Sequence, residues 1–310
     1  MSMHQASGRW QLGLALALVT AACWATLPLA LKITLEQLDV YTLTWFRFLL
    51  AAGIMGAWLA ARGGLGGFAR LDRQRWWWLG AAALLLIGNY VLYLLGVQHT
   101  TPANAQLLIQ LAPLLMALGG IVVFGEHFSR WQWLGLALIA IGLGLFFSDQ
   151  LRAAAQAAGY VGGSLLVILA AVVWAGYALI QKQLLLRLSS PAILLFIYIS
   201  ASVVLLPLAA PRALLALDGL HWALLLYCAL NTLVAYGAFA EALAHWEASR
   251  VSAILATTPL LCLASGAIVH AWWPSVLAPE RVSAIGFGGA ALVVLGSTLS
   301  SLMGRRRASA

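Results

Sequence analysis

The sequence predicts an all-α membrane protein in which ten transmembrane helices form two inverted five-helix repeats. Three observations predict this fold class: an excess of apolar residues, ten long apolar stretches, and self-similarity between the two halves. Of the 310 residues, 63% are hydrophobic and 8% are charged, whereas soluble domains are about 25% charged. A water-soluble fold of this length could not bury so much apolar surface, so a lipid bilayer must surround most of the chain.

Ten stretches are apolar and long enough to cross a membrane, since a spanning helix needs about 20 mainly apolar residues. They are 12–31, 40–61, 76–97, 102–124, 131–148, 160–181, 190–210, 221–243, 249–271 and 282–303. The connections are short, and the longest, 62–75, is rich in glycine and arginine. We therefore expect no soluble domain, and we expect the first stretch to remain as a helix rather than to be cleaved as a signal peptide.

The basic residues between these stretches predict the orientation of the chain. Twelve Lys and Arg residues fall on the side of the N-terminus, four fall on the opposite side, and Arg47 lies inside a span. Cytoplasmic loops carry the excess of Lys and Arg, so both termini are predicted to be cytoplasmic, with the protein in the inner membrane. This topology accounts for the formal net charge of +8, and nucleic acid is not an expected partner.

An internal repeat divides the chain into residues 1–150 and 151–310, with five helices each. The segments "WATLPLALK" and "WAGYALIQK" share Trp, Ala and Lys at an offset of 150 residues. Further matched pairs follow at offsets of 146 and then 154: Tyr90 and Tyr236, His99 and His245, Pro113 and Pro259, Gly142 and Gly296. Because five is an odd number, the second half must enter the membrane upside down, which is a plan that many transporters use.

The stretch 102–124 carries polar residues that are costly in lipid. Gln106, Gln110 and Pro113 are spaced i, i+4 and i+7, so they share one face of a helix. Pro113 lacks the N–H that would bond the carbonyl of Ile109, and that carbonyl is predicted to be free for water or substrate if the face lines a cavity. The alternative is that the amides bond neighbouring helices and that the proline only kinks the chain. Asn104 is expected near the entrance.

Further polar and aromatic residues lie well inside other spans, whereas most membrane tryptophans lie at the interface. The predicted substrate-binding residues are Trp24, Asn89, Tyr90, Tyr93, Gln106, Gln110, Trp174, Tyr177, Asn231 and Tyr236, with Pro113 and Pro259 as hinges. Such a cavity would stack a flat substrate, or would bind an ammonium group through cation–π contact. Packing of the core is the alternative for each aromatic residue. Near Pro259, Thr257 and Thr258 can instead bond a carbonyl of the preceding turn.

Charged residues in or near the spans have several interpretations. Arg47 lies about two helical turns inside its span, where it can snorkel outward, pair with Glu36 or Asp39, or contact a substrate carboxylate. Lys32 and Lys182 are expected to snorkel. Glu241 is the best carboxylate for a proton relay, although an interfacial position is the simpler interpretation. The three cysteines are expected to be buried apolar residues.

The chain resembles the drug/metabolite transporter superfamily, in its EamA-type branch. The resemblance rests on the two segments quoted above and on "HTTPANAQLLIQLAPLLMALGGIVVFGEHFSRWQWLGLALIAIGLGLF". The second half departs from that pattern, because Trp272 stands where the repeat would place a glutamate. The resemblance implies helices 1, 3, 4, 6, 8 and 9 around a central cavity, helices 5 and 10 as a scaffold, and export of amino acids or related metabolites.

The sequence therefore predicts a secondary transporter rather than an enzyme. It has no phosphate-binding GxxxxGK[ST] loop, no metal-binding HExxH and no catalytic-triad signature, so no cofactor or metal is expected. We expect export of small metabolites, aromatic amino acids first among them, across the cytoplasmic membrane by alternating access. The alternatives are an exporter of drug-like cations and an intramembrane enzyme acting on a lipid-type substrate. Small residues such as Gly53 with Ala57, and Gly286 with Ala290, indicate close helix contacts within the monomer or in a homodimer.

Overall fold

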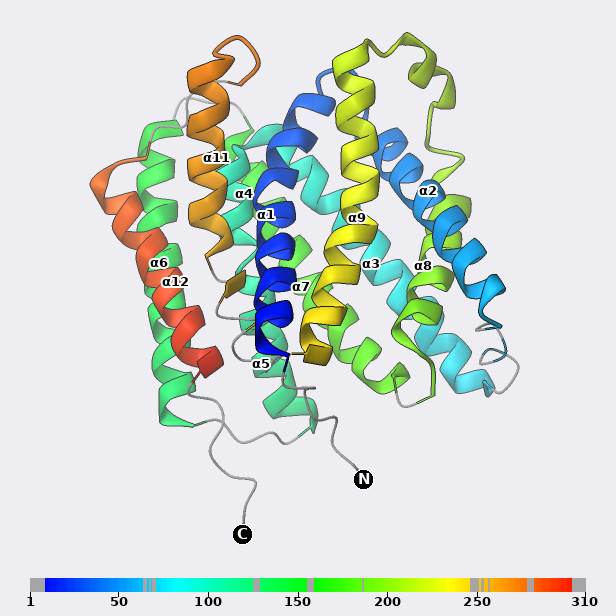
Figure 1. Cartoon of the computed structure of the whole chain (residues 1–310). Coiled ribbons are helices and arrows are strands. Elements are labelled where there is room, and N and C mark those ends of the chain that lie inside the picture. The colour runs from blue at the N-terminus through cyan, green and yellow to red at the C-terminus, as the bar shows by residue number, and fades with distance from the viewer. Residues whose placement is uncertain are drawn as a thin grey trace.

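The computed structural model forms a bundle of helices (Figure 1). It describes residues 9–63, 66, 68, 71–124, 129–154, 159–185, 187–245, 251, 254–255, 257–277 and 282–302. The helices are α1 (Trp10–Thr34), α2 (Val40–Ala61), α3 (Arg73–His99), α4 (Pro102–Leu108), α5 (Leu111–Phe124), α6 (Arg130–Ala154), α7 (Tyr160–Leu184), α8 (Ser190–Leu205), η2 (Pro211–Ala216), α9 (Gly219–His245), α11 (Thr258–Trp272) and α12 (Ala284–Leu302). The described residues include no strand, and the all-α prediction is confirmed for this part of the chain.

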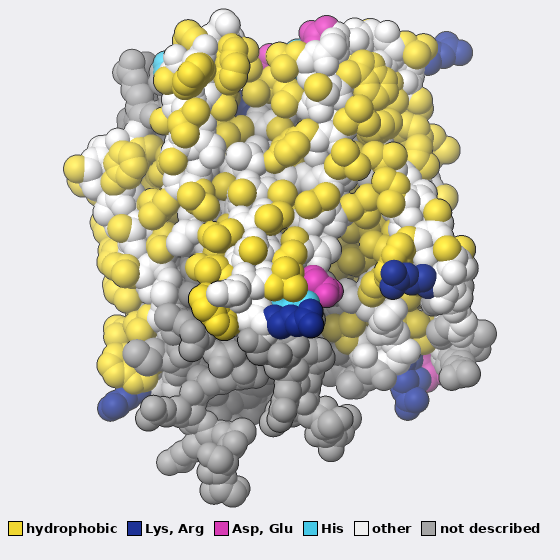
Figure 2. Space-filling model, in the orientation of Figure 1, with side chains coloured by type: hydrophobic (Ala, Val, Ile, Leu, Met, Phe, Trp, Pro, Cys, Tyr) yellow, Lys and Arg dark blue, Asp and Glu magenta, His cyan; other side chains and the backbone are white. Residues whose placement is uncertain are grey.

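The outer surface of the bundle is suited to lipid. Five helices within the described residues, namely α1, α2, α3, α7 and α9, are long and apolar enough to cross a membrane, and α6, α8, α11 and α12 contribute shorter apolar helices. Large hydrophobic side chains point outward along them, including Leu84, which is 65% exposed, and Val203, which is 66% exposed. Figure 2 shows that hydrophobic side chains dominate the middle of the visible face, while most of the visible Lys and Arg lie toward one end.

Three of the predicted spans have other bounds in the structure. The stretch 102–124 is interrupted after Leu108 and forms α4 and α5. The stretch 190–210 ends as α8 at Leu205, two residues before Pro207, which lacks the N–H that would continue the helical hydrogen bonds. The helix α11 begins at Thr258, directly before Pro259, which is a favoured residue in the first turn of a helix. A proline lies near each of these three differences.

Aspartates hold the starts of three helices. Asp39 accepts hydrogen bonds from the amides of Tyr41 and Thr42, each at 2.9 Å, and Asp72 accepts one from Arg75 at 2.9 Å. Asp218 accepts from the amide of His221 at 2.9 Å. This hydrogen bond from the His221 amide, together with those to the His221 ring and the Gln37 side chain, lowers the pKa of Asp218 to about 2. These carboxylates satisfy exposed N–H groups at helix N-termini.

The helices pack mainly in pairs, each joining one element from the first half of the chain to one from the second. The most extensive contacts are α6 with α12, α3 with α7, α1 with α9, and α2 with α8, followed by α5 with α7 and α1 with α11. In Figure 1, α6 and α12 lie together at the edge of the bundle, and α1 and α9 lie together at its centre. Phe48 of α2 and Tyr198 of α8, both almost fully buried, anchor a core cluster between α2, α3, α7 and α8.

Glycines bring the backbones of α6 and α12 into contact. A Cβ atom added to Gly142 would lie 2.5 Å from the carbonyl oxygen of Gly289, and one added to Gly296 would lie 2.5 Å from that of Gly135. The contacts join residues in opposite order along the two helices, so α6 and α12 are antiparallel. Small residues allow this close approach where lipid provides no hydrophobic drive for association.

We expect the substitution Gly142→Ala to destabilise the bundle by about 1–3 kcal/mol, because the new methyl group overlaps backbone that cannot rotate away. The unfolding midpoint of the purified protein in detergent measures the effect. Gly144→Ala is the matched control, since its Cβ would meet nothing within 4 Å. Equal midpoints for the two variants would contradict the close contact.

Candidate functional site

The helix predicted over residues 102–124 is broken three residues before Pro113. Thr101 caps α4, where its side chain accepts from the amide of Asn104. At the break, the backbone N–H of Gln110 donates a hydrogen bond to the carbonyl of Leu107 at 3.0 Å. The backbone N–H of Ala112 donates one to the carbonyl of Ile109 at 2.9 Å. The prediction that the Ile109 carbonyl is free is therefore wrong, because the chain tightens to i→i+3 bonds that use it. The ring of Pro113 lies outside the described side chains.

Asn104, which is expected near the entrance, lies in the first turn of α4 and is buried. Its side chain is fully buried, and its Nδ2 donates to Oγ of Ser164 in α7 at 2.9 Å. Its Oδ1 has no hydrogen-bond partner among the described residues. Asn104 thus ties α4 to α7 and leaves one acceptor unused.

The two glutamines flank the break. Gln106, on α4, is buried, and its Oε1 lies 3.4 Å from the hydroxyl of Tyr93 on α3, which is a long hydrogen bond. Gln110 lies in the turn between α4 and α5 and is half-buried. Its side chain makes no hydrogen bond within the described part of the chain. Gln110 is therefore the amide most available to a ligand.

Aromatic side chains from α1, α3 and α9 meet near the centre of the bundle. The ring of Trp24 lies 5.7 Å from that of Tyr236 in an edge-on arrangement, and 5.7 Å from that of Phe239. Tyr90 lies against the guanidinium of Arg47, and its side chain interacts electrostatically with that of Tyr236. We refer to Tyr90 and Tyr236 as the tyrosine pair. It joins two positions that the sequence repeat makes equivalent.

Arg47 of α2 extends into this region and is only 2% exposed. One guanidinium nitrogen, Nη2, donates to the hydroxyl of Thr232 on α9 at 3.1 Å, and the guanidinium carbon lies 5.0 Å from the centre of the Tyr90 ring. The Nε atom is buried without a hydrogen-bond partner among the described residues. Removing such a cation from water costs several kcal/mol, whereas a desolvated cation–π contact contributes about 2 kcal/mol.

Two of the interpretations considered for Arg47 are wrong. The side chain does not snorkel, because it is buried. It does not pair with Asp39 or Glu36: both Asp39 oxygens accept from residues of the first turn of α2, and Glu36 is exposed. Contact with a substrate is the interpretation left open. Arg47 and Thr232 were not among the predicted site residues. Arg47 is the cation that lies deepest inside a predicted span, and that signal could have identified it.

Asn89 and Asn231 bond neighbouring helices. Nδ2 of Asn89 donates to the carbonyl of Ala170 on α7 at 2.9 Å. Nδ2 of Asn231 donates to the carbonyl of Cys23 on α1 at 2.8 Å and to the hydroxyl of Tyr227 at 3.1 Å. These contacts match the alternative in which membrane amides join helices.

Trp174 and Tyr177, on α7, pack against the cluster anchored by Phe48 and Tyr198. Tyr177 is buried within that cluster, and the half-buried Trp174 lies against it with its ring 6.4 Å from the Tyr177 ring. Their contacts are those of core residues.

Residues next to Pro259 follow the expected pattern. Pro259 lies in the first turn of α11. The hydroxyl of Thr257 donates to the carbonyl of Ile254 at 2.7 Å, and that of Thr258 donates to the carbonyl of Leu255. The prediction that these threonines bond the preceding turn is confirmed.

Lys32, which is predicted to snorkel, caps the end of a helix. Its Nζ donates to the carbonyls of Val97, Gln98 and Thr100 at 2.9, 2.7 and 2.7 Å. These carbonyls end α3, where a cation is also favoured by the helix dipole. The side chain of Lys182 lies outside the described residues. Glu241 is exposed and lies 3.2 Å from Nε2 of His245, which agrees with the interfacial interpretation.

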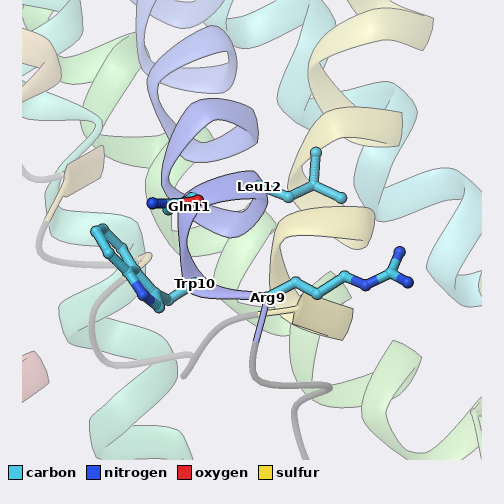
Figure 3. Close-up of a pocket in the computed structure, with 4 residues that line it drawn as sticks. All are labelled: Arg9, Trp10, Gln11 and Leu12. Carbon is cyan, nitrogen blue, oxygen red and sulfur yellow. The ribbon is translucent and has the colours of Figure 1, made fainter.

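A surface pocket lies at the beginning of α1, far along that helix from Trp24. It is lined by Arg9, Trp10, Gln11 and Leu12 (Figure 3). Four consecutive residues form it, and Trp10 is largely exposed, as expected of an interfacial tryptophan. None of the predicted site residues contributes to it.

A helical membrane bundle with aromatic, amide and cationic side chains converging inside it is the architecture of a membrane transporter. The family model of the EamA-like transporter family matches residues 11–148 and again 161–302. The chain belongs to the EamA-like transporter family, and the resemblance drawn from the sequence is confirmed.

Similar proteins agree with this membership. The chain is 37% identical to the "Uncharacterized inner membrane transporter YhbE" of Escherichia coli (strain K12), over 97% of this chain and 93% of that protein. It is 25% identical to the "Probable amino-acid metabolite efflux pump" of Salmonella typhimurium, over 91% of this chain and 92% of that protein. A solved crystal structure shares the fold with a TM-score of 0.64 at 20% identity, covering 97% of this chain and 100% of the other.

We expect Asn89→Ala to lower stability by about 1 kcal/mol, because it removes an interhelical hydrogen bond within the membrane. Gln110→Ala is the comparison, since the Gln110 side chain bonds nothing in the described residues. Chemical or thermal unfolding in detergent measures both. A loss of stability in Gln110→Ala as large as that in Asn89→Ala would contradict these assignments.

Proposed function

We propose that this chain is a secondary transporter that exports small metabolites, with aromatic amino acids first among them, across the inner membrane by alternating access. The observation that carries the proposal is a cluster from four helices, in which the Trp24 ring lies 5.7 Å from that of Tyr236 and the Arg47 guanidinium lies 5.0 Å from that of Tyr90. Family membership supports transport, and the substrate and mechanism are the proposed part.

The pairing of helices supports ten spans in two inverted units, residues 1–150 and 151–310. A two-fold relation between the halves would make α1 equivalent to α7, α2 to α8, α3 to α9, α5 to α11, and α6 to α12. The contact of α1 with α9 then becomes that of α7 with α3, and α1 with α11 becomes α7 with α5. The pairs α2 with α8 and α6 with α12 map onto themselves. Replacing each helix by its equivalent therefore converts these contacts into contacts that are also observed. This is expected of a two-fold relation between the halves.

Individual contacts follow the same exchange. The sequence offset of 154 residues converts the contact of Gly142 with Gly289 into that of Gly296 with Gly135. The repeat makes Asn89 equivalent to Ala235, and Ala170 equivalent to Thr20. The hydrogen bond from Asn89 to the Ala170 carbonyl therefore has a counterpart in the bond from the Thr20 hydroxyl to the Ala235 carbonyl at 3.4 Å.

The place of the tyrosine pair follows from this symmetry. Two equivalent residues whose side chains are neighbours would lie close to the axis that relates them, and an axis in the membrane plane lies midway through the lipid. A substrate at the tyrosine pair would therefore be equally far from both sides of the membrane. Trp24 and Phe239 would supply flat apolar surface there, and Gln106 and Gln110 would supply polar contacts from the neighbouring α4 segment.

The interrupted helices supply flexible points for alternating access. The break at Ile109–Gln110 precedes Pro113, and α11 begins beside Pro259, its equivalent in the repeat. We propose that these two points bend as each half opens and closes.

The proposed orientation has both termini in the cytoplasm. The threefold excess of Lys and Arg on that side supports it. The start of α1 and the end of α12 also lie toward the same end of the bundle (Figure 1).

An amino-acid substrate is favoured over a drug-like cation. The relative from Salmonella typhimurium is described as a probable amino-acid metabolite efflux pump. In addition, the buried positive charge of Arg47 would repel a purely cationic ligand at the tyrosine pair.

Growth of a bacterium that overexpresses the chain tests the proposal. We expect tolerance to toxic analogues of aromatic amino acids, and exchange of labelled aromatic amino acids by proteoliposomes that contain the purified protein. Proteoliposomes that exchange none of the twenty amino acids would reject amino-acid export.

We expect Gln110→Leu to lower the rate of exchange about fivefold, because the loss of one substrate hydrogen bond of about 1 kcal/mol has that effect. Folded yield should stay close to wild type, since the side chain bonds nothing else in the described residues. Gln11→Leu, at the exposed start of α1, makes the same chemical change as a control. Unaltered exchange by Gln110→Leu would remove the α4–α5 break from the pathway.

A further inference from the structure

We infer that Arg47 is the receptor for the carboxylate of the transported substrate. The inference rests on the proposed function, and it names the chemical group that the central region recognises. Arg47 comes from α2, which the family resemblance leaves out of the helices around the cavity. Its guanidinium nevertheless lies beside the tyrosine pair, with the ring of Tyr90 at 5.0 Å.

The charge of Arg47 has no fixed counter-ion among the described residues. Of the acidic residues in that part of the chain, Asp39, Asp72 and Asp218 cap helices, and Glu36 is exposed. The other two also lie elsewhere, since Asp149 bonds Ser283 and Glu241 approaches His245. Buried cations in proteins are normally paired, so an unpaired guanidinium inside a transporter points to an anion that comes and goes.

One donor of Arg47 is left unused by the described residues. Nη2 is held by Thr232, one face of the guanidinium lies toward Tyr90, and Nε–H is buried with no acceptor. A carboxylate matches the planar fork of an arginine and would supply the missing acceptor. The side chain of Tyr90, which lies beside the guanidinium, would stand beside the same carboxylate.

The positive charge occurs in one half only. The caps Asp39 of α2 and Ser189 of α8 are 150 residues apart, and the same offset places Ile197 opposite Arg47. Ile197 is fully buried. A single cation beside the two-fold axis would bind one carboxylate at a time, as an amino acid with one α-carboxylate requires.

A purely structural role is the rival interpretation, because Arg47 also links α2 to α3 and α9. The two roles differ in what the ligand must carry. A structural Arg47 stabilises the bundle without regard to ligand charge, whereas a receptor distinguishes a carboxylate from the corresponding amide.

The first experiment uses the unmodified full chain in detergent. The unfolding midpoint is measured with each of the twenty L-amino acids, and then with the amide and the decarboxylated amine of each amino acid that raises it, for example L-phenylalanine, L-phenylalaninamide and phenethylamine. A ligand that binds the folded state raises the midpoint. We expect the acids to bind at least about tenfold more tightly than their amides, as loss of a charged hydrogen bond implies. Equal binding of acid and amide, or no response to any amino acid, would overturn the inference.

The second experiment removes the charge. Arg47→Gln should weaken acid binding about 100-fold, since an interaction between buried charges is lost, and should leave amide binding nearly unchanged. Arg62→Gln is the matched control: Arg62 follows the same helix, lies over the Trp58 ring at 4.7 Å, and is exposed. Wild-type acid binding by Arg47→Gln would refute the assignment.

Arg47→Lys keeps the inference testable if Arg47→Gln does not fold. Lysine keeps the charge and loses the planar fork, so acid binding should fall about tenfold while amide binding holds. Acid and amide binding that fall together would show a structural role instead.

Proteoliposome exchange separates this inference from the proposed function. Acid-selective binding that depends on Arg47, without exchange of the bound acid, would support the carboxylate site and reject export. Exchange of amides or amines that Arg47→Gln leaves unaltered would support an exporter and reject the carboxylate site.

Discussion

In the hydrocarbon of a membrane, every polar group must find its partner inside the protein, and this requirement organises the bundle. Lys32 lies at the end of one helix and satisfies three carbonyls at the end of another. Asn89 and Asn231 bond backbone carbonyls of neighbouring helices. Buried atoms without a partner among the described residues include Nε of Arg47 and the carbonyl oxygens of the Asn104 and Asn231 side chains. Arg47 differs from the two amides because its side chain carries a charge.

The proposed symmetry of the two halves would explain why these aromatic residues gather where they do. Tyr90 of α3 and Tyr236 of α9 occupy positions that the proposed repeat makes equivalent, and the edge-on contact of Trp24 with Tyr236 adds α1 to the same place. Arg47, beside Tyr90, would break this symmetry. A site of symmetric shape and asymmetric charge would accept a substrate from either side while holding it in one orientation.

Composition and periodicity were sufficient to predict an all-helical membrane protein and the limits of helices such as α2 and α7. They were insufficient to predict local breaks in a helix and the hydrogen-bond partners of polar side chains. The spacing of Gln106, Gln110 and Pro113 indicated one polar face but not the break at Ile109–Gln110, which depends on local i→i+3 bonding. Asn89 looked like a ligand-binding amide and bonds Ala170 instead, since its partner lies 81 residues away in sequence and only tertiary packing reveals it.

The glycine contacts between α6 and α12 bear on how the protein is assembled. Each of these helices brings glycine backbone against the backbone of the other. One helix lies in the first half of the chain, and the other is the last helix that the structure describes. The first half therefore lacks its packing partner for α6 until α12 has been synthesised and inserted.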